Sequence, residues 1–131
     1  MENRFERVKA YLFDMDVAVI DEIPEEEIVI IADEENGIMN MVVDCEAPIV
    51  ILEQMILDVP AEPGDLFSEL LKMNRTLVHG AFVLDESGKR VIFRDTLQLE
   101  NLDRNELEAS IHALSLALSE YGETLLGYMG K

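Results

Sequence analysis

The sequence predicts an α+β fold, in which helices pack on an antiparallel β-sheet and the elements follow the order α-β-β-β-β-α-β-β-α. Three observations lead to this prediction. Runs of strand-forming residues are joined by short turns that carry hairpin signals. Apolar residues at helical spacing mark three separate segments. A length of 131 residues, 49% of them hydrophobic, is sufficient for one packed domain, which we expect to span residues 1–131.

The first helix is expected over residues 3–15, where apolar residues recur at helical spacing. Asn3 is a suitable N-cap and Glu6 follows it by three residues, which is the capping-box arrangement. A helix of this length is marginal in isolation, so it must dock on the rest of the chain. Its apolar face consists of Phe5, Val8, Tyr11, Leu12 and Met15.

Four strands are expected next. The pair Asn36-Gly37 is a strong hairpin signal, because both residues accept positive φ in a type I′ turn. The adjacent polar residues Glu53 and Gln54 interrupt the last run, which indicates a bulge or a strand that leaves the cover of the sheet. The predicted strands cover residues 17–23, 27–33, 38–45 and 49–59.

These strands do not alternate between apolar and polar residues. Ile28 and Ile30 lie on one face of their strand, while Val29 and Ile31 lie on the other. An antiparallel sheet normally leaves one face to water and shows a regular alternation. We therefore expect the second face to be covered by a helix or by another chain, which is a first indication of self-association.

The second half of the chain predicts a short helix ending near Asn74, a hairpin and a long helix. Strands at residues 82–85 and 90–97 flank a turn in which Gly88 supplies the positive φ. Asp103 is the N-cap of the long helix, and Glu106 completes a capping box. The apolar seam of this helix consists of Leu107, Ile111, Leu114, Leu118, Tyr121 and Leu125.

The opposite side of the long helix is also uncharged. No Asp, Glu, Lys or Arg occurs from Ala109 to Ser119, and Leu116 lies roughly opposite the seam. A helix on the surface of a monomer would usually carry charges there. Either strands cover the helix on two sides or its back contacts another subunit. The candidate dimer interface consists of Ala109, His112, Ala113 and Leu116.

The net charge of -18 is distributed unevenly, because no Lys or Arg occurs between Ala10 and Leu71. Such a surface repels phosphate backbones and anionic lipids, so we expect no nucleic-acid and no membrane partner. Basic peptides, basic protein surfaces and cations are the partners that this field attracts. The alternative is a charged coat that keeps an apolar domain soluble.

The sequence favours a cytoplasmic protein. Cys45 is the only cysteine, so an internal disulfide is excluded and a reducing compartment is expected. The first residues carry charges throughout and lack the apolar core of a signal peptide. No apolar run approaches the length that is needed to span a bilayer.

The residues show no spacing typical of an active site, so we predict that the protein is not an enzyme and has no cofactor and no metal centre. Cys45 with His79 or His112 is the only Cys/His combination, and Cys45 is the better candidate for a small core residue. The glycines form no phosphate-binding loop. The acidic turns match no EF-hand, although a divalent-cation or small-ligand sensor that uses them stays the alternative function.

Methionines mark a candidate partner-binding surface. Met39 and Met41 are expected to share a strand face, and Met55 lies on the next strand. Flexible thioethers suit surfaces that accept varied apolar partners, although Met also fills cores. Arg94 is a lone cation within a strand, beside Asp95, and an ion pair that fixes the hairpin explains it better than a ligand contact.

The sequence from residue 70 to residue 126 resembles the YbjN-like family of bacterial proteins, which are described as sensory transduction regulators. The resemblance rests on LLKMNR, GAFVLD, FRDTLQLENL and SLALSEYG. It covers the second half well, while the first half agrees more in element order than in residues. It implies a type III secretion chaperone-like fold, a homodimer, and a cytoplasmic protein that binds other proteins without catalysing a reaction.

The leading hypothesis is a non-catalytic, protein-binding module that is chaperone-like or regulatory and acts as a dimer. Its partner is expected to be a protein or a peptide, with basic ones favoured by the acidic surface. The fold alone does not establish a role in secretion.

Overall fold

The structure is a computed structural model that describes residues 3–129. The predicted α+β architecture and the predicted element order are confirmed. Each expected helix and strand is present within a few residues of its expected bounds. The elements are α1 (Arg4–Asp14), β1 (Ala18–Ile23), η1 (Pro24–Glu26), β2 (Ile28–Asp33), η2 (Glu34–Asn36), β3 (Ile38–Glu46), β4 (Ile49–Asp58), α2 (Leu66–Asn74), β5 (Ala81–Leu84), β6 (Arg90–Gln98) and α3 (Arg104–Leu126).

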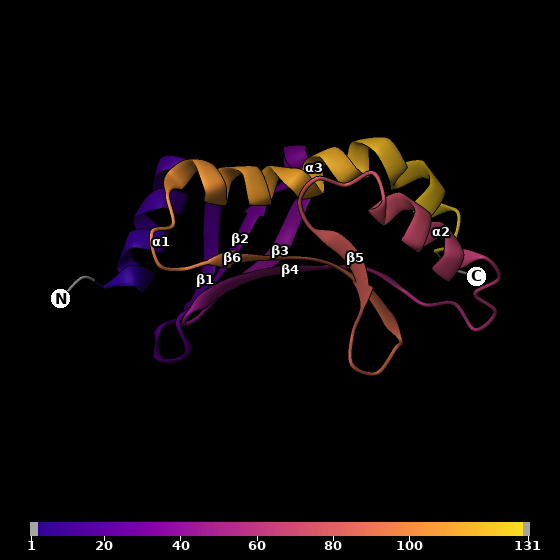
Figure 1. Ribbon diagram of the computed structural model, residues 1–131, viewed down its shortest axis with the longest axis horizontal. Helices are drawn as coiled ribbons and strands as arrows, with labels where there is room; N and C mark the ends of the chain where they lie inside the picture. The colour runs from indigo at the N-terminus through magenta and orange to yellow at the C-terminus, as the bar shows by residue number, and fades with distance from the viewer. Residues whose placement is uncertain (1–2, 130–131) are drawn as a thin grey trace.

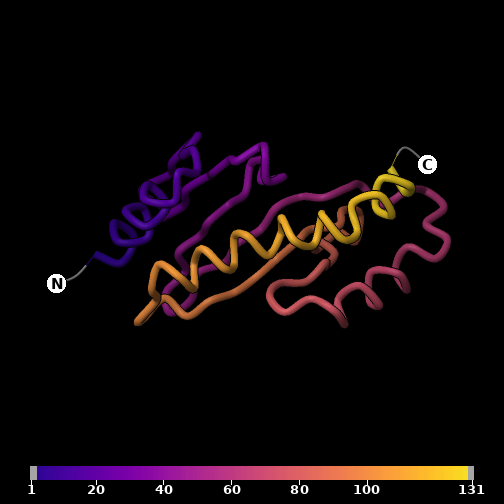
Figure 2. Tube along the Cα trace, turned by 90° about the horizontal axis from the view of Figure 1, so that it is seen from above, coloured from indigo at the N-terminus to yellow at the C-terminus, as the bar shows by residue number. Residues whose placement is uncertain are grey.

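The six strands form one sheet in the order β1-β2-β3-β4-β6-β5, and every neighbouring pair is antiparallel. The three α-helices lie on the same side of this sheet (Figure 1). Seen from above, α3 runs obliquely across the sheet, with α1 on one side of it and α2 on the other (Figure 2). The second face of the sheet is therefore left without a helix by the residues that the structure describes.

The core lies between the sheet and the helices. The side chains of Val29, Ile31 and Phe93 lie on the helix-covered face of the sheet and are almost completely buried. Leu107 and Leu114 of α3 are buried as well. Burial of one such side chain contributes about 1.5–3 kcal/mol relative to exposure. The predicted seam of α3 is confirmed, since four of its residues are buried and Leu118 and Tyr121 pack partly buried against the core.

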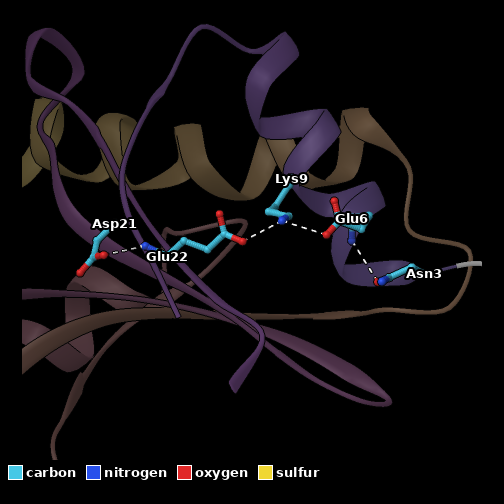
Figure 3. A network of polar contacts seen from close by, with 5 residues as sticks. All are labelled: Asn3, Glu6, Lys9, Asp21 and Glu22. Atoms are coloured by element: carbon cyan, nitrogen blue, oxygen red, sulfur yellow. Dashed lines mark hydrogen bonds and ion pairs between the residues drawn. The ribbon is translucent and has the colours of Figure 1, made fainter. Parts of the chain in front are cut away.

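Both predicted helix caps are present. The side chain of Asn3 accepts a hydrogen bond from the Glu6 backbone amide at 3.2 Å, and Asp103 accepts one from the Glu106 amide at 2.7 Å. Helix α1 is also tied to β1 by Lys9, whose Nζ lies 2.7 Å from Glu22 Oε1 and 2.9 Å from Glu6 Oε1 (Figure 3). The hydrogen bond to Glu22, followed by that to Glu6, raises the pKa of Lys9.

The turn between β2 and β3 differs from the prediction. A type I′ turn would require positive φ at both Asn36 and Gly37, but only Gly37 adopts it, with φ of 76°. Residues Glu34–Asn36 form a short 3₁₀ turn instead. The Asn36 side chain donates a hydrogen bond to Asp33 Oδ2 at 2.7 Å, and the Gly37 amide donates one to the Glu34 carbonyl at 3.0 Å. The hairpin forms as predicted, with a longer turn.

Bulges interrupt both β3 and β4. Ile31 pairs with Met41, and Asp33 pairs with Ile38, so β3 advances three residues where β2 advances two. Asn40 is in the left-handed region with φ of 54°, at the position of this bulge. In β4 the register with β6 shifts between Met55 and Leu57. The irregularity indicated by the pair at residues 53–54 is therefore present slightly further along the strand.

We expect Gly80→Ala to lower the melting temperature more than Gly88→Ala. Both glycines have a φ near +75°, so each substitution costs about 1 kcal/mol in backbone strain. A Cβ at Gly88 meets nothing within 4 Å, whereas at Gly80 it would lie 2.7 Å from Cε1 of Phe93. The Phe93 ring is buried and packs edge-on against Phe82, so it is held in place. Thermal unfolding of both variants tests this steric term, and equal losses would contradict it.

Candidate functional site

All four residues of the candidate dimer interface line one groove, but only Ala109, His112 and Leu116 are exposed on the outer side of α3, whereas Ala113 is buried and belongs to the core. The groove has a volume of about 510 Å³ and lies between α3 and the segment that connects α2 to β5, and we call it the Leu116 groove. Leu116 is 71% exposed, and Val78 on the opposite wall is 89% exposed. Other residues that line it are Thr76, Leu77, His79, Ala109, His112, Ala113, Ala117, Ser119 and Glu120.

Polar contacts hold the connecting segment beside α3. The Asn74 side chain accepts a hydrogen bond from the Phe82 amide at 2.8 Å and donates one to the Phe82 carbonyl at 3.0 Å, which ties the end of α2 to β5. The hydroxyl groups of Thr76 and Tyr121 form a hydrogen bond that joins this segment to α3. The apolar wall around Val78 is therefore fixed by the fold and left open to solvent.

A second groove lies on the other flank of α3. It has a volume of about 580 Å³ and is formed by the beginning of β3, the middle of β4 and the C-terminal half of α3. No charged residue lines it within the described chain. We call it the methionine groove; its lining consists of Gly37, Met39, Asn40, Gln54, Met55, Ile56, Leu118, Gly122, Leu125, Leu126 and Met129.

The methionine groove exists because β3 and β4 separate. Their pairing ends at Val42↔Glu53, while β4 continues beside β6 as far as Asp58. Gln54 bridges the gap with its buried side chain: Oε1 accepts a hydrogen bond from the Met39 amide and Nε2 donates one to the Gly37 carbonyl, each at 3.0 Å. The side-chain amide thus satisfies backbone groups that a paired strand would otherwise have satisfied.

The candidate methionines do not lie together as predicted. Met39 and Met55 are 57% and 48% exposed and line the same groove, but Met41 is 1% exposed and belongs to the core. The expectation that Met39 and Met41 share a strand face is wrong. The left-handed residue Asn40 adds one residue between them, so the alternation of side chains is reversed at that point.

Acidic residues surround a third groove, of about 570 Å³, at the turns that follow β1 and β3. Asp44 is the unusual member, because its Oδ1 atom is shielded from solvent and has no hydrogen-bond partner. Burial, and then the nearby charges of Glu46, Glu26 and Glu53, raise the pKa of Asp44. Within residues 3–129 no group of three His, Cys, Asp or Glu side chains is placed to hold a metal ion. The cation-sensor alternative stays a prediction.

The only cysteine lies apart from both histidines. Cys45 is buried, as predicted, and burial raises the pKa of its thiol to about 12, so the reactive thiolate is disfavoured. It lines the acidic groove, whose lining contains no histidine, while His79 and His112 line the Leu116 groove. The described residues therefore do not form the Cys/His pair that the sequence left open.

The helix-free face of the sheet is partly apolar. Ile28, Ile30 and Ile51 lie on it and are half-buried. Arg94 also lies there, and its Nη1 is 3.5 Å from Glu53 Oε1 on β4. Arg94 therefore forms an ion pair, but the pair joins β4 to β6 and does not fix the β5–β6 hairpin as expected. Asp95 is not its partner, because adjacent residues of a strand point to opposite faces.

Among residues 3–129, none of the helices combines the length and the apolar character that a membrane crossing requires.

Comparisons with known proteins agree with this fold. The family model CesT_Tir_1 matches residues 1–131. No curated protein sequence matches the chain. Among solved structures, YbjN from E. coli has a TM-score of 0.71 at 13% identity, with 92% of each chain covered. In the HopA1-SchA chaperone-effector complex, the TM-score is 0.61 at 11% identity, with 97% of this chain and 94% of that chain covered.

A further solved structure is the Yersinia pestis type III secretion chaperone SycH in complex with a fragment of YscM2. Its TM-score is 0.57 at 8% identity, with 96% of this chain and 99% of that chain covered. These likenesses show a type III secretion chaperone-like fold, and the resemblance to YbjN that the sequence motifs indicated is confirmed.

We expect Asp44→Asn to stabilise the protein at neutral pH. The raised pKa means that the ionised carboxylate is disfavoured in the folded state, so the folded state bears a penalty above that pKa which the variant lacks. The gain, roughly 1–3 °C in melting temperature, should shrink as the pH falls through the raised pKa and vanish near the ordinary value of 3.8. Thermal unfolding measured across this pH range tests it.

Glu35→Gln is the matched control for Asp44→Asn, because it removes the same charge from an exposed turn. If both variants raise the melting temperature equally, general repulsion between negative charges explains the gain. The buried environment of Asp44 then does not explain it.

Proposed function

The chain belongs to the CesT_Tir_1 family of type III chaperones, and from this premise we propose that it is a non-catalytic, protein-binding module, chaperone-like or regulatory, that acts as a homodimer. We propose further that residues 1–131 act as a single domain, that the protein works in the cytoplasm, and that it needs no cofactor. Family membership supports the absence of catalysis. The inert environment of Cys45 supports it as well.

The Leu116 groove is the main observation that supports a dimer. Soluble monomers rarely leave a contiguous apolar patch exposed, yet Leu116 and Val78 are among the most exposed apolar side chains of the described chain. No charged side chain from Ala109 to Ser119 opposes contact with a second apolar surface. Covering this face would remove the patch from water.

A two-fold symmetric dimer fits this surface. In such a dimer the same patch is used by both copies, so the Leu116 of each copy packs into the groove of the other. A stable interface of this kind buries about 1,600 Å² in total. The apolar face of α3 would form its centre, and Glu120 and the exposed end of the connecting segment would lie at its rim.

The partner is proposed to be another protein or a peptide. Two solved structures with this fold are chaperones bound to another protein, and they support a protein partner here. A net charge of -18 disfavours nucleic acid and anionic membranes and favours a basic partner.

The second candidate function is a small-ligand or divalent-cation sensor that uses the acidic turns. The acidic groove and the unpartnered Oδ1 of Asp44 favour it. Melting temperatures measured with and without calcium, magnesium and manganese separate the two functions, because a ligand that binds only the folded state raises the melting temperature, and raises it further as its concentration increases.

We expect light scattering at micromolar concentration to give twice the chain mass of 14.8 kDa. Leu116→Glu places two charges in the centre of the symmetric interface and should give the monomer mass. Phe13→Glu is the control, because Phe13 is 82% exposed on α1, a helix that contributes no residue to the Leu116 groove. A monomeric wild-type chain would contradict the dimer. A dimeric Leu116→Glu variant would move the interface to the helix-free face of the sheet.

A further inference from the structure

The methionine groove is an apolar surface that the proposed dimer leaves open. Successive residues of an α-helix are rotated by about 100°, so Leu118 and Gly122 lie about 160° and about 120° around α3 from Leu116, and Leu126 lies about 80° from it. No residue lines both grooves. Leu126 is 64% exposed and Met129 is 49% exposed. The groove and the proposed dimer interface therefore occupy different sides of the same helix.

The walls of this groove adapt more easily than its floor. Met39, Met55 and Met129 contribute unbranched thioether side chains from three separate elements, and such side chains adjust to apolar groups of different shape. The floor is held in place, because the Gln54 side chain on β4 is hydrogen-bonded across the gap to Gly37 and Met39 at the start of β3. This combination suits an apolar side chain that inserts from outside.

The charges around the groove select the flanks of its occupant. Glu34 and Glu35 lie in η2, the turn that leads through Asn36 to Gly37 of the groove, and both are exposed. No Lys or Arg lines the groove within the described residues. Acidic residues beside an apolar stretch would be repelled by these two carboxylates and by the net charge of -18, whereas Lys or Arg would meet opposite charge.

We propose that the methionine groove binds a short apolar segment of a partner protein that is flanked by Lys or Arg. The apolar side chains of the segment lie between Met39, Met55 and Leu126, and its basic residues lie beside Glu34 and Glu35. This inference rests on the proposed function, since it assumes that the chain binds another protein, and it names the chemistry of the segment that is bound.

Three synthetic peptides test the proposal with the full chain. One has a short core of Leu and Phe with Lys at both ends, the second has the same core with Glu at both ends, and the third keeps the Lys ends but has a core of Ser. Fluorescence anisotropy measures binding. We expect the first peptide to bind, the second to bind at least about tenfold more weakly, and the third not to bind.

Isotope-labelled methionine methyl groups report where the peptide binds. The signals of Met39, Met55 and Met129 should move when the first peptide is added, while that of Met73, buried in α2, should stay. Met55→Asp and Leu126→Asp should each weaken binding about tenfold or more. Met55 and Leu126 are 48% and 64% exposed, so the variants are expected to fold, and Phe13→Asp is the control at an exposed apolar site that does not line the groove.

The experiment gives different results if the groove is wrongly assigned and if the chain does not bind other proteins. If the first peptide binds without moving the signals of Met39, Met55 and Met129, the groove assignment is overturned while protein binding stands. Equal affinity for the Lys and Glu peptides overturns the assignment of basic flanks. If no peptide binds, the inference falls, and the chain mass measured on the same sample shows separately whether the dimer persists.

Discussion

The packing of α3 across one face of the sheet is the constraint on which the rest of the structure depends. The helix buries Leu107, Ile111 and Leu114 against strands that are distant in sequence, and α1 and α2 occupy the sheet on either side of it. A helix that packs on one face of a sheet leaves its outer side and part of each flank uncovered. In most surface helices those positions are charged, but α3 carries no charged residue from Ala109 to Ser119, so the same helix that completes the core also borders two apolar grooves.

Local patterns in the sequence were sufficient to predict the helices and strands and the buried side of α3. Caps at Asn3 and Asp103, the turn at Gly88 and the seam of α3 each depend on residues within a few positions of one another, and each is present. The order of strands in the second half could not be read in the same way, because the pairing of β4 with β6 joins segments separated by a helix and another strand.

The side chains of the candidate site were only partly predictable, for a related reason. The outer face of α3 follows from helical periodicity, so the four candidate residues line one groove, although Ala113 is buried. Met39 and Met41 were assigned to one face by the two-residue period of a strand, but that period holds only while the register is regular. The bulge at Asn40 is set by pairing with β2, and no local feature of the sequence marks it. Val78 was missed because an isolated apolar residue in a connecting segment carries no periodic signal.

The central claim is that the outer face of α3 is covered in solution while the methionine groove stays open. Relaxation of labelled methyl groups by a soluble paramagnetic probe tests this claim most directly. Leu116 and Val78 should be protected to nearly the level of the buried Leu114, whereas Leu126 should be as accessible as Ile20, which is 50% exposed on the edge strand β1. Accessibility of Leu116 and Val78 equal to that of Ile20 would contradict the account.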